Sequence, residues 1–312
     1  MVQPLISLII CTRNRAEQLS RSLKAVEKLI FDGAWQLVVV NNGSTDKTES
    51  IISEFKKNSS LNITYVYEPV PGLSRARNAG VSNAEAEVLA FTDDDCYPKE
   101  DFLTRIFSCM SNKDYDFCGG RVLLYDNNDA KITVQEKNES LVIEPKKSLY
   151  SGLLIGANMA LRKSAIVSID GFDERIGAGT RYAAGEETDV MNRLGNKGGI
   201  GFFDPLIVVN HHHGRQSKSE IKSILKSYSK GRGACLVKAA FSSDLSKMKK
   251  VKSWYWNKKH QSISQAYYET IYALLFLIEN RFSRAKIVEH PFKSLVITTK
   301  NSAESILKVR PQ

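Results

Sequence analysis

The chain has 312 residues, with 42% hydrophobic and 25% charged side chains, which is the composition of an ordinary globular protein. Its length holds one large α/β domain with an extension, or two modest domains. The longest apolar stretch, residues 271–278, is far shorter than the ~20 residues of a membrane-spanning helix, so it is interpreted as a core helix or an interfacial helix.

The net charge of +10 is unevenly distributed along the chain. Residues 1–210 hold 24 Lys and Arg against 28 Asp and Glu, whereas residues 211–312 hold 20 against 6. The basic segment also contains Trp254, Tyr255 and Trp256. Such a segment indicates contact with an anionic lipid surface or another polyanion, although a solvated helical face has the same composition.

The first hundred residues alternate predicted strands with predicted helices. Four segments have the apolar or alternating pattern of strands: residues 5–11, 37–40, 63–67 and 88–91. Apolar residues recur at helical spacing between them, as at Leu19, Leu23 and Val26. This order of strands and helices predicts a doubly wound α/β sheet.

The remainder of the chain divides into a polar segment, late strands and a helical end. Residues 126–148 are polar, and we expect a mobile insertion or lid there. Residues 202–203 and 206–209 are expected as two late strands, and the pattern after His213 is helical and basic. We therefore expect a first domain over residues 1–215 and a mainly helical extension over residues 216–312.

The five cysteines indicate the redox compartment. They are odd in number and show no CxxC spacing, which favours reduced thiols in a cytosolic protein over a disulfide framework. Residues 1–4 lead directly into the first strand without a secretory signal pattern. We therefore expect a cytoplasmic protein, with the basic extension in peripheral contact with the inner face of the membrane.

Three adjacent acids, Asp93, Asp94 and Asp95, follow the apolar strand 88–91. Like charges this close repel one another, so a cation should offset them. A hard divalent cation prefers oxygen ligands and often bridges carboxylates to phosphates, and open α/β sheets bind their ligands at the carboxyl ends of strands. The triplet therefore indicates a metal-bridged phosphate site, against the alternative of a solvated acidic turn.

Two polar turns and one cationic segment should lie beside these acids. Residues 12–15 and 41–44 each follow a predicted parallel strand, and their side chains can hydrogen-bond a base or ribose or simply cap the next helix. Residues 72–80 include Arg75 and Arg77, which supply planar, permanently charged donors for a base or a phosphate.

Taken together, these segments resemble the family 2 glycosyltransferases of the GT-A fold over residues 5–215. The resemblance rests on blocks in the expected order: residues 7–15, 39–46, 72–80, 91–95, 156–160, 171–174 and 185–189. Each block is weak alone, whereas the ordered set is specific. The resemblance implies a doubly wound mixed GT-A sheet, an inverting transfer from a nucleotide-diphospho-sugar, and Mn²⁺ or Mg²⁺ on the diphosphate.

The resemblance also assigns residues that contact the donor. Thr12, Arg13 and Asn41 match nucleoside contacts, but the family usually has Asp where Asn41 stands. Because asparagine both donates and accepts hydrogen bonds, this departure weakens the assumption of a uracil base, and UDP-, GDP- and dTDP-sugars stay open as donors. The residues expected to bind the nucleotide-sugar are Thr12, Arg13, Arg15, Asn41, Arg75, Arg77, Asn78, Asp93, Asp94 and Asn158.

Asp93 and Asp95 match the first and last acids of the family's DxD motif. The resemblance places Asp93 on the ribose side and Asp95 on the metal, and it leaves the role of Asp94 open. The family often has one histidine as a further metal ligand, and within residues 211–213 the match favours His211. The expected metal ligands are therefore Asp95, Asp93 and His211.

An acidic helix start, residues 186–189, is the expected position of the catalytic base. Acids in a first helical turn are favoured by the helix dipole alone, but the same position holds a carboxylate ready to accept a hydroxyl proton. The resemblance favours Glu187, where many relatives have Asp, with Glu186 as the second choice. Asp189 is expected to help position the acceptor.

The expected activity is transfer of a sugar to a hydroxyl of a glycan, a polysaccharide or a lipid-linked saccharide, as in synthesis of a cell-envelope polysaccharide. One alternative is a sugar-nucleotide nucleotidyltransferase, but residues 12–15 lack the glycine-rich loop that it needs. The other is a non-catalytic basic module for a membrane or polyanion. No motif that reads nucleic acid is present, so no specific nucleic-acid partner is expected.

Overall fold

The computed structural model describes residues 2–145, 152–241 and 262–282. Within them the strands are β1 (Ile6–Thr12), β2 (Trp35–Asn41), β3 (Asn62–Tyr67), β4 (Val88–Asp93), β5 (Cys96–Pro98), β6 (Tyr115–Leu124), β7 (Leu141–Ile143), β8 (Met159–Arg162) and β9 (Ile200–His211). The helices are α1 (Ala16–Val26), α2 (Thr48–Asn58), α3 (Leu73–Asn83), α4 (Phe102–Ser111), α5 (Lys163–Ser168), α6 (Glu186–Asn196), α7 (Lys218–Phe241) and α9 (Ile263–Phe282).

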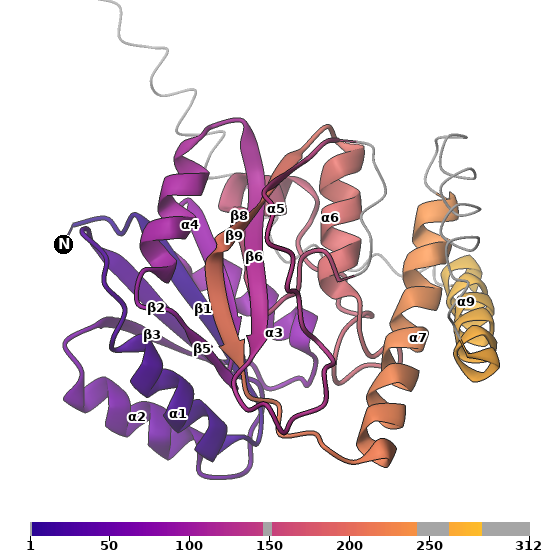
Figure 1. Ribbon diagram of the computed structural model, residues 1–312, viewed down its shortest axis with the longest axis horizontal. Helices are drawn as coiled ribbons and strands as arrows, with labels where there is room; N and C mark the ends of the chain where they lie inside the picture. The colour runs from indigo at the N-terminus through magenta and orange to yellow at the C-terminus, as the bar shows by residue number, and fades with distance from the viewer. Residues whose placement is uncertain (1, 146–151, 242–261, 283–312) are drawn as a thin grey trace, which may run out of the picture.

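The described strands form one mixed sheet in the order β3-β2-β1-β4-β8-β6-β9-β5, with β7 paired to β9. Strands β1 to β4 are mutually parallel where they pair, whereas β8 runs antiparallel to both β4 and β6. Figure 1 shows the sheet between helices, with α7 and α9 beside one another at the side next to α6. The predicted doubly wound mixed sheet is confirmed.

Alternation along β1 shows why both faces of the sheet are covered. Ile6, Leu8 and Ile10 pack with α1, α2 and α4 on one face. Ile9 packs on the other face with α3, α5 and α6. Because successive side chains of a strand point to opposite faces, an almost continuous apolar run is what a strand between two helical layers requires.

The sheet also corrects two of our expectations. The late strands expected at 202–203 and 206–209 form the single strand β9, which bulges around Pro205 where its register with β6 shifts. Pro205 has no N–H for the ladder, and its carbonyl oxygen accepts a hydrogen bond from Nε of Arg121 instead. The expected mobile segment 126–148 contains β7, which is part of the sheet.

Helices α7 and α9 pack on each other and on the rest of the protein. Phe276 of α9 is buried with Tyr182, and the Tyr182 hydroxyl donates to Glu279, 2.7 Å away. Lys238 of α7 lies 2.7 Å from Asp173 and 2.8 Å from Asp189. Trp254, Tyr255 and Trp256 lie outside the described residues. No helix in the described part of the chain is long and apolar enough to cross a membrane.

Candidate active site

A cavity of about 610 Å³ opens at the carboxyl ends of β1 and β4. Its charged and imidazole side chains come from the ends of β1, β4 and β9 or the segments after them, and from α3, α6 and α7: Arg13, Arg15, Arg77, Asp93, Asp94, Asp95, Glu186, Glu187, His211, Arg215 and Arg232. Parallel pairing places the last residues of β1 beside those of β4, with Cys11 opposite Asp93. The acids and the polar turn after β1 therefore meet in one place, as the strand pattern predicts.

Arg15 forms ion pairs with two of the three adjacent acids, Asp94 and Asp95. Its Nη2 lies 2.7 Å from Oδ2 of Asp95, and its Nη1 lies 3.2 Å from Oδ1 of Asp94. The hydroxyl of Thr12 donates to Asp94 over 2.7 Å. Asp94 and Asp95 are both buried, so this pairing offsets part of their negative charge.

The two buried carboxyls differ in their pKa. Burial raises the pKa of Asp94 to about 7, against the opposing effect of Arg15. Burial acts on Asp95 in the same direction, but the hydrogen bond and charge of His211, with those of Arg15, hold its pKa well below the usual range. Asp95 is therefore the carboxyl of this pair that stays ionised at neutral pH.

Asp95 and His211 meet because β5 pairs with the end of β9. Cys96 lies opposite His211 in that pair, and Nε2 of His211 is 3.3 Å from Oδ1 of Asp95. His213, by contrast, contacts the carbonyl of Ala130 and the backbone N–H of Arg215. Of His211 and His213, only His211 contacts one of the three adjacent acids, Asp95.

The donor set around Asp95 fits a hard divalent cation. Ligand atoms of Asp95, Cys96 and His211 all lie within 4.8 Å of one another. Burial raises the pKa of the Cys96 thiol well above its ordinary value, so the thiol is a poor ligand, whereas a carboxylate and an imidazole suit Mn²⁺. Nδ1 of His211 is buried without a hydrogen-bond partner among the described residues.

Arg77 connects the acids of β4 with the start of α6. Its side chain is buried, with Nη1 2.9 Å from Oε1 of Glu186 and Nη2 3.4 Å from Oδ1 of Asp93. Residues two apart on a helix point in different directions, so Arg75 faces outward and pairs with Glu174. Arg77 therefore lines the cavity, whereas Arg75 does not.

Glu187 is the acid of the α6 start without an ion pair to any described residue. The helix begins after Gly185, whose φ of +94° lies in the left-handed region that a side chain would strain. Glu187 is half-buried and lines the cavity. Burial, with the charge of Glu186, raises the pKa of Glu187 to about 8. A carboxyl with such a pKa is largely protonated at neutral pH, and its ionised form, which grows as the pH approaches 8, is the form that accepts a proton.

Helix α7 forms a wall of the cavity that sequence reasoning missed. Ile224, Tyr228 and Arg232 line it from positions four residues apart, so they share one face of the helix. Burial raises the pKa of Tyr228 to about 12. The spacing of the tyrosine and arginine within a basic helix is the one signal that could have indicated this wall. Asn42, from the polar turn 41–44, and Leu73, from the segment 72–80, also line the cavity.

Other residues expected at the site are not among those that line the cavity: Asn41, Arg75, Asn78, Asn158 and Asp189. Each has partners within the protein. Asn41 donates to the Tyr65 hydroxyl, 3.2 Å away.

Internal hydrogen bonds and ion pairs occupy the buried members of that set. The amide of Asn78 contacts the Phe172 carbonyl and that of Asn158 contacts the Ile207 carbonyl, each over 3.0 Å. Asp189 pairs with Arg193 and Lys238. Buried polar groups without partners are costly, and these contacts explain why Asn78 and Asp189 are polar without a ligand. The side-chain oxygen of Asn158, in contrast, is buried without a hydrogen-bond partner among the described residues.

Comparisons of the sequence identify relatives. Residues 7–169 match the model of glycosyl transferase family 2. Glycosyltransferase AglE of Haloferax volcanii is 28% identical over 180 residues, which cover 56% of this chain and 58% of that protein. An uncharacterized glycosyltransferase of Nostoc, alr2836, is 31% identical over 127 residues, covering 41% of this chain and 39% of that one. The chain thus spans about half the length of these curated relatives.

Solved structures share the fold. The mannosyltransferase PcManGT from Pyrobaculum calidifontis, in complex with GDP-Man and Mn²⁺, matches with a TM-score of 0.62 at 16% identity over 97% of this chain and 81% of that one. S. aureus TarS in complex with UDP-GlcNAc matches with a TM-score of 0.57 at 16% identity, over 80% and 71%. With a family model that spans more than half of its length and a GT-A sheet, the chain belongs to glycosyltransferase family 2.

Proposed function

We propose that this glycosyltransferase moves a sugar from a nucleotide-diphospho-sugar to an acceptor hydroxyl by a single in-line displacement with inversion. The observation that supports this most directly is the joint lining of one cavity by Asp95 and Glu187. One is an ionised acid that suits a metal, and the other is an acid with a raised pKa that suits proton transfer. Separate groups for the leaving group and for the acceptor are what a direct displacement needs.

We assign donor binding to the part of the cavity at the carboxyl end of β4, where Arg15 and Arg77 also lie. Asp95 and His211, with Asp93, would hold a divalent cation. When bound, this ion stabilises the negative charge that develops on the leaving diphosphate. Arg15 and Arg77 supply permanent positive charge in the same cavity, which Thr12 at the end of β1 and Arg13 also line. The two arginines thus favour an anionic donor whose diphosphate lies at the carboxyl end of β4.

The acceptor side is assigned to Glu187. Its carboxylate takes the proton of the acceptor hydroxyl as the hydroxyl oxygen forms a bond to the anomeric carbon. The bond from that carbon to the diphosphate oxygen breaks, and its electron pair leaves with the nucleoside diphosphate. The enzyme supplies no nucleophile, so no covalent sugar–enzyme species forms.

The donor class is supported by the complexes of the structural neighbours, which hold GDP-Man and UDP-GlcNAc. The base stays open, because the amide of Asn41 donates to Tyr65 and its oxygen accepts from the Ser44 N–H. Release of nucleoside diphosphate from UDP-, GDP- and dTDP-sugars, each with and without Mn²⁺, tests the proposal. Metal-dependent release that is lost in D95N supports it, and no release from any donor under these conditions contradicts it.

The E187Q variant tests the base. Turnover should fall by at least about 100-fold, the usual contribution of a positioned base, while donor binding changes little because Gln keeps the size of the side chain. Donor binding is measured by calorimetry and turnover by release of nucleoside diphosphate. If E187Q keeps near-normal turnover, Glu187 is not the base, and the same assay on E186Q examines the second choice.

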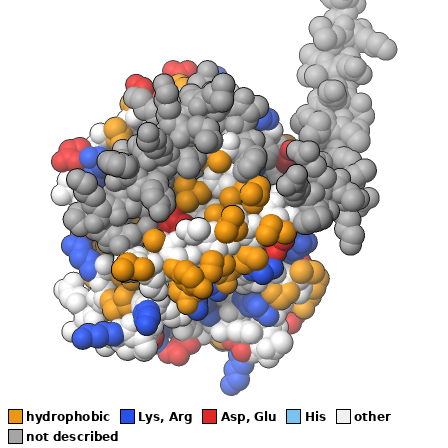
Figure 2. Space-filling model, turned by 90° about the vertical axis from the view of Figure 1, so that its right-hand side faces the viewer, with side chains coloured by type: hydrophobic (Ala, Val, Ile, Leu, Met, Phe, Trp, Pro, Cys, Tyr) orange, Lys and Arg blue, Asp and Glu red, His pale blue; other side chains and the backbone are white. Residues whose placement is uncertain are grey.

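We further propose that the C-terminal helices bring the enzyme to a membrane that holds a lipid-linked or growing glycan acceptor. Figure 2 shows hydrophobic side chains gathered on the face with α7 and α9. On α9, Ile263, Tyr267, Leu274 and Ile278 are all more than half exposed, at spacings of one helix face. An apolar face in a basic segment suits peripheral contact with anionic lipids.

Vesicle flotation tests this contact with full-length protein. The variant L274S/I278S should bind vesicles of anionic lipid at least about tenfold more weakly, because two apolar side chains no longer enter the interface. The matched control is V142S/L206S, whose side chains are 48% and 53% exposed on strands. Equal binding by both variants would contradict the proposal.

A further inference from the structure

A second cavity, of about 1100 Å³, shares no lining residue with the candidate active site. It lies between α1, the segment after β5 and the end of β6. His211 and His212 are adjacent in the chain, yet the first lines the active-site cavity and the second lines this one. Successive side chains of an extended segment point to opposite sides, which explains the division.

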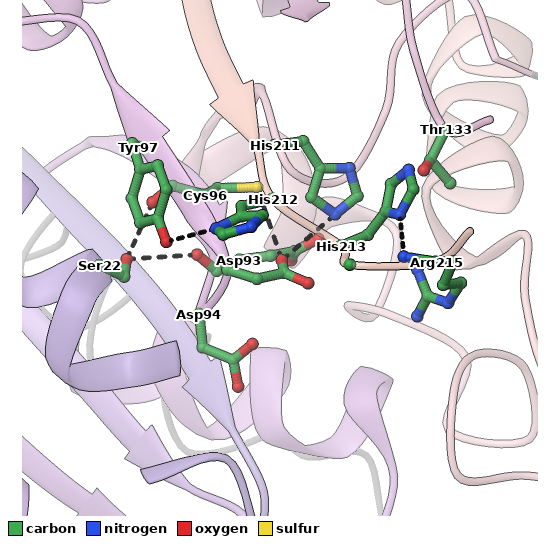
Figure 3. A network of polar contacts seen from close by, with 12 residues as sticks. Ser22, Asp93, Asp94, Cys96, Tyr97, Thr133, His211, His212, His213 and Arg215 are labelled. Carbon is green, nitrogen blue, oxygen red and sulfur yellow. Dashed lines mark hydrogen bonds and ion pairs between the residues drawn. The ribbon is translucent and has the colours of Figure 1, made fainter. Parts of the chain in front are cut away.

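One wall of this second cavity is aromatic. The rings of Tyr97 and Tyr125 meet edge to face with centroids 4.6 Å apart, and the imidazole of His212 lies 5.0 Å from the Tyr125 ring. The Tyr97 hydroxyl is 3.2 Å from Nδ1 of His212 (Figure 3). Tyr125 is nevertheless 58% exposed, so the cluster presents an open ring to the cavity instead of filling a core.

The lining of this second cavity is also basic. Lys24 and Lys28 line the cavity from α1 and its C-terminal end, four residues apart, and Lys99 lines it from the loop after β5. All three are exposed, and none has an ion pair within the described part of the chain. The lining also contains two acids, Glu100 and Asp101. Asp101 is paired with Arg105 over 2.9 Å. Like charges at this helical spacing repel, so an anion between them would be stabilising.

We propose that this cavity binds an acidic saccharide, a sugar chain with carboxylate or phosphate groups, at a site separate from catalysis. The C–H faces of a sugar ring pack against the open face of Tyr125, and the lysines pair with the anionic groups. The volume is large enough for several sugar units. The choice of a saccharide rests on the proposed function, since a glycosyltransferase works among glycans.

The site is next to the catalytic segment without being part of it. The backbone N–H of His212 donates to the Asp95 carbonyl over 2.9 Å, and the Ser22 hydroxyl donates to the Cys96 carbonyl over 3.0 Å. A saccharide in the second cavity would therefore lie next to the segment that carries Asp95. Its role is to keep an acidic glycan near the enzyme between transfers.

Calorimetry with the full-length enzyme tests the site. The probes are a hexamer of galacturonate, a neutral maltohexaose and a single-stranded oligonucleotide of matched charge. The galacturonate hexamer should bind more tightly than the other two. K24Q/K28Q and Y125A should each weaken its binding about tenfold, which corresponds to ~1.4 kcal/mol.

The matched control is K56Q/K57Q, which removes two exposed lysines at the end of α2. Its binding should change less than about twofold, within the range of a screened long-range charge effect. Equal loss in both lysine variants, unchanged binding in Y125A, or preference for the oligonucleotide would each overturn the proposal. Release of nucleoside diphosphate, assayed in parallel, should be unchanged in K24Q/K28Q, so failure of the site and failure of the proposed function give different results.

Discussion

The guanidinium of Arg77 lies 2.9 Å from the carboxylate of Glu186, although the two residues are 109 positions apart in the chain. Both side chains are buried, and the same guanidinium approaches Asp93. This ion pair therefore holds the start of α6 against the acidic end of β4. It also occupies Glu186, which leaves its neighbour Glu187 as the acid available for proton transfer.

Replacement of Arg77 should be severely destabilising. R77M leaves the buried carboxylate of Glu186 without a cation, and loss of one partner of a buried pair costs about 3–5 kcal/mol. R75M is the control, because Arg75 pairs with Glu174 at the surface, where the expected loss is at most about 1 kcal/mol. Urea unfolding measures both free energies. Similar values for the two variants would contradict a structural role for the Arg77–Glu186 pair.

Glu187 should lower the stability of the enzyme as the pH rises. Its pKa is about 8 in the folded protein against an ordinary value of 4.5, so between these values the unfolded chain releases a proton that the folded chain retains. Stability is therefore lost through that window. E187Q cannot titrate, so at pH 8 it should exceed the wild type by at least about 1.4 kcal/mol, with no such gain near pH 4.5. Unfolding curves at the two pH values measure this difference.

Turnover should depend on the same ionisation in the opposite direction. The base acts only when deprotonated, so turnover should rise with pH and level off above about 8, the pKa of Glu187. The residual activity of E187Q should lack this rise. The pH range of about 6 to 9 brackets the pKa of Glu187. If wild-type turnover does not change across this range, Glu187 is not the group whose titration controls turnover.

Mn²⁺ should stabilise the folded enzyme through Asp95 and His211. At about 100 times the dissociation constant, a ligand of the native state adds about 2.7 kcal/mol and raises Tm. D95N and H211A should lose this response, whereas D114N, which removes an exposed acid elsewhere, should retain it. Differential scanning fluorimetry with added nucleoside diphosphate measures the shift. An undiminished response in D95N would place the metal elsewhere.

Gly231 should be required for the close contact between α7 and the loop before α6. A Cβ at this position would lie 1.7 Å from the carbonyl oxygen of Ala184, so α7 would have to move. Overpacking of this kind costs about 1–3 kcal/mol, against the gain of about 1 kcal/mol that alanine has in an open helix. G231A should also lower turnover, because Ala184 and Gly185 line the cavity.

The control for this substitution is K222A, an exposed position on the same helix. It should leave both Tm and turnover close to the wild type, because no neighbour is displaced. Thermal unfolding and the nucleoside diphosphate assay measure the two effects. A G231A enzyme with wild-type stability and turnover would show that α7 adapts without affecting the site.

The fold was predictable from the sequence where the pattern is local. The apolar runs of β1, β2 and β4 are typical of strands covered on both faces, and parallel pairing then brings their polar ends together. The short strands β5 and β7 have three residues each and offer no period to recognise. The bulge of β9 around Pro205 was missed because a proline normally interrupts a strand.

The sequence by itself determined the family, the doubly wound sheet and the edge at which the acids lie, because these depend on residue order and short-range periodicity. Only the tertiary structure decided how adjacent residues of the same type divide their roles. Arg77 is buried while Arg75 is partly exposed, and Glu186 forms an ion pair while Glu187 forms none with a described residue. The direction of each side chain from its element, and the partner it meets there, depend on long-range packing that no local pattern contains.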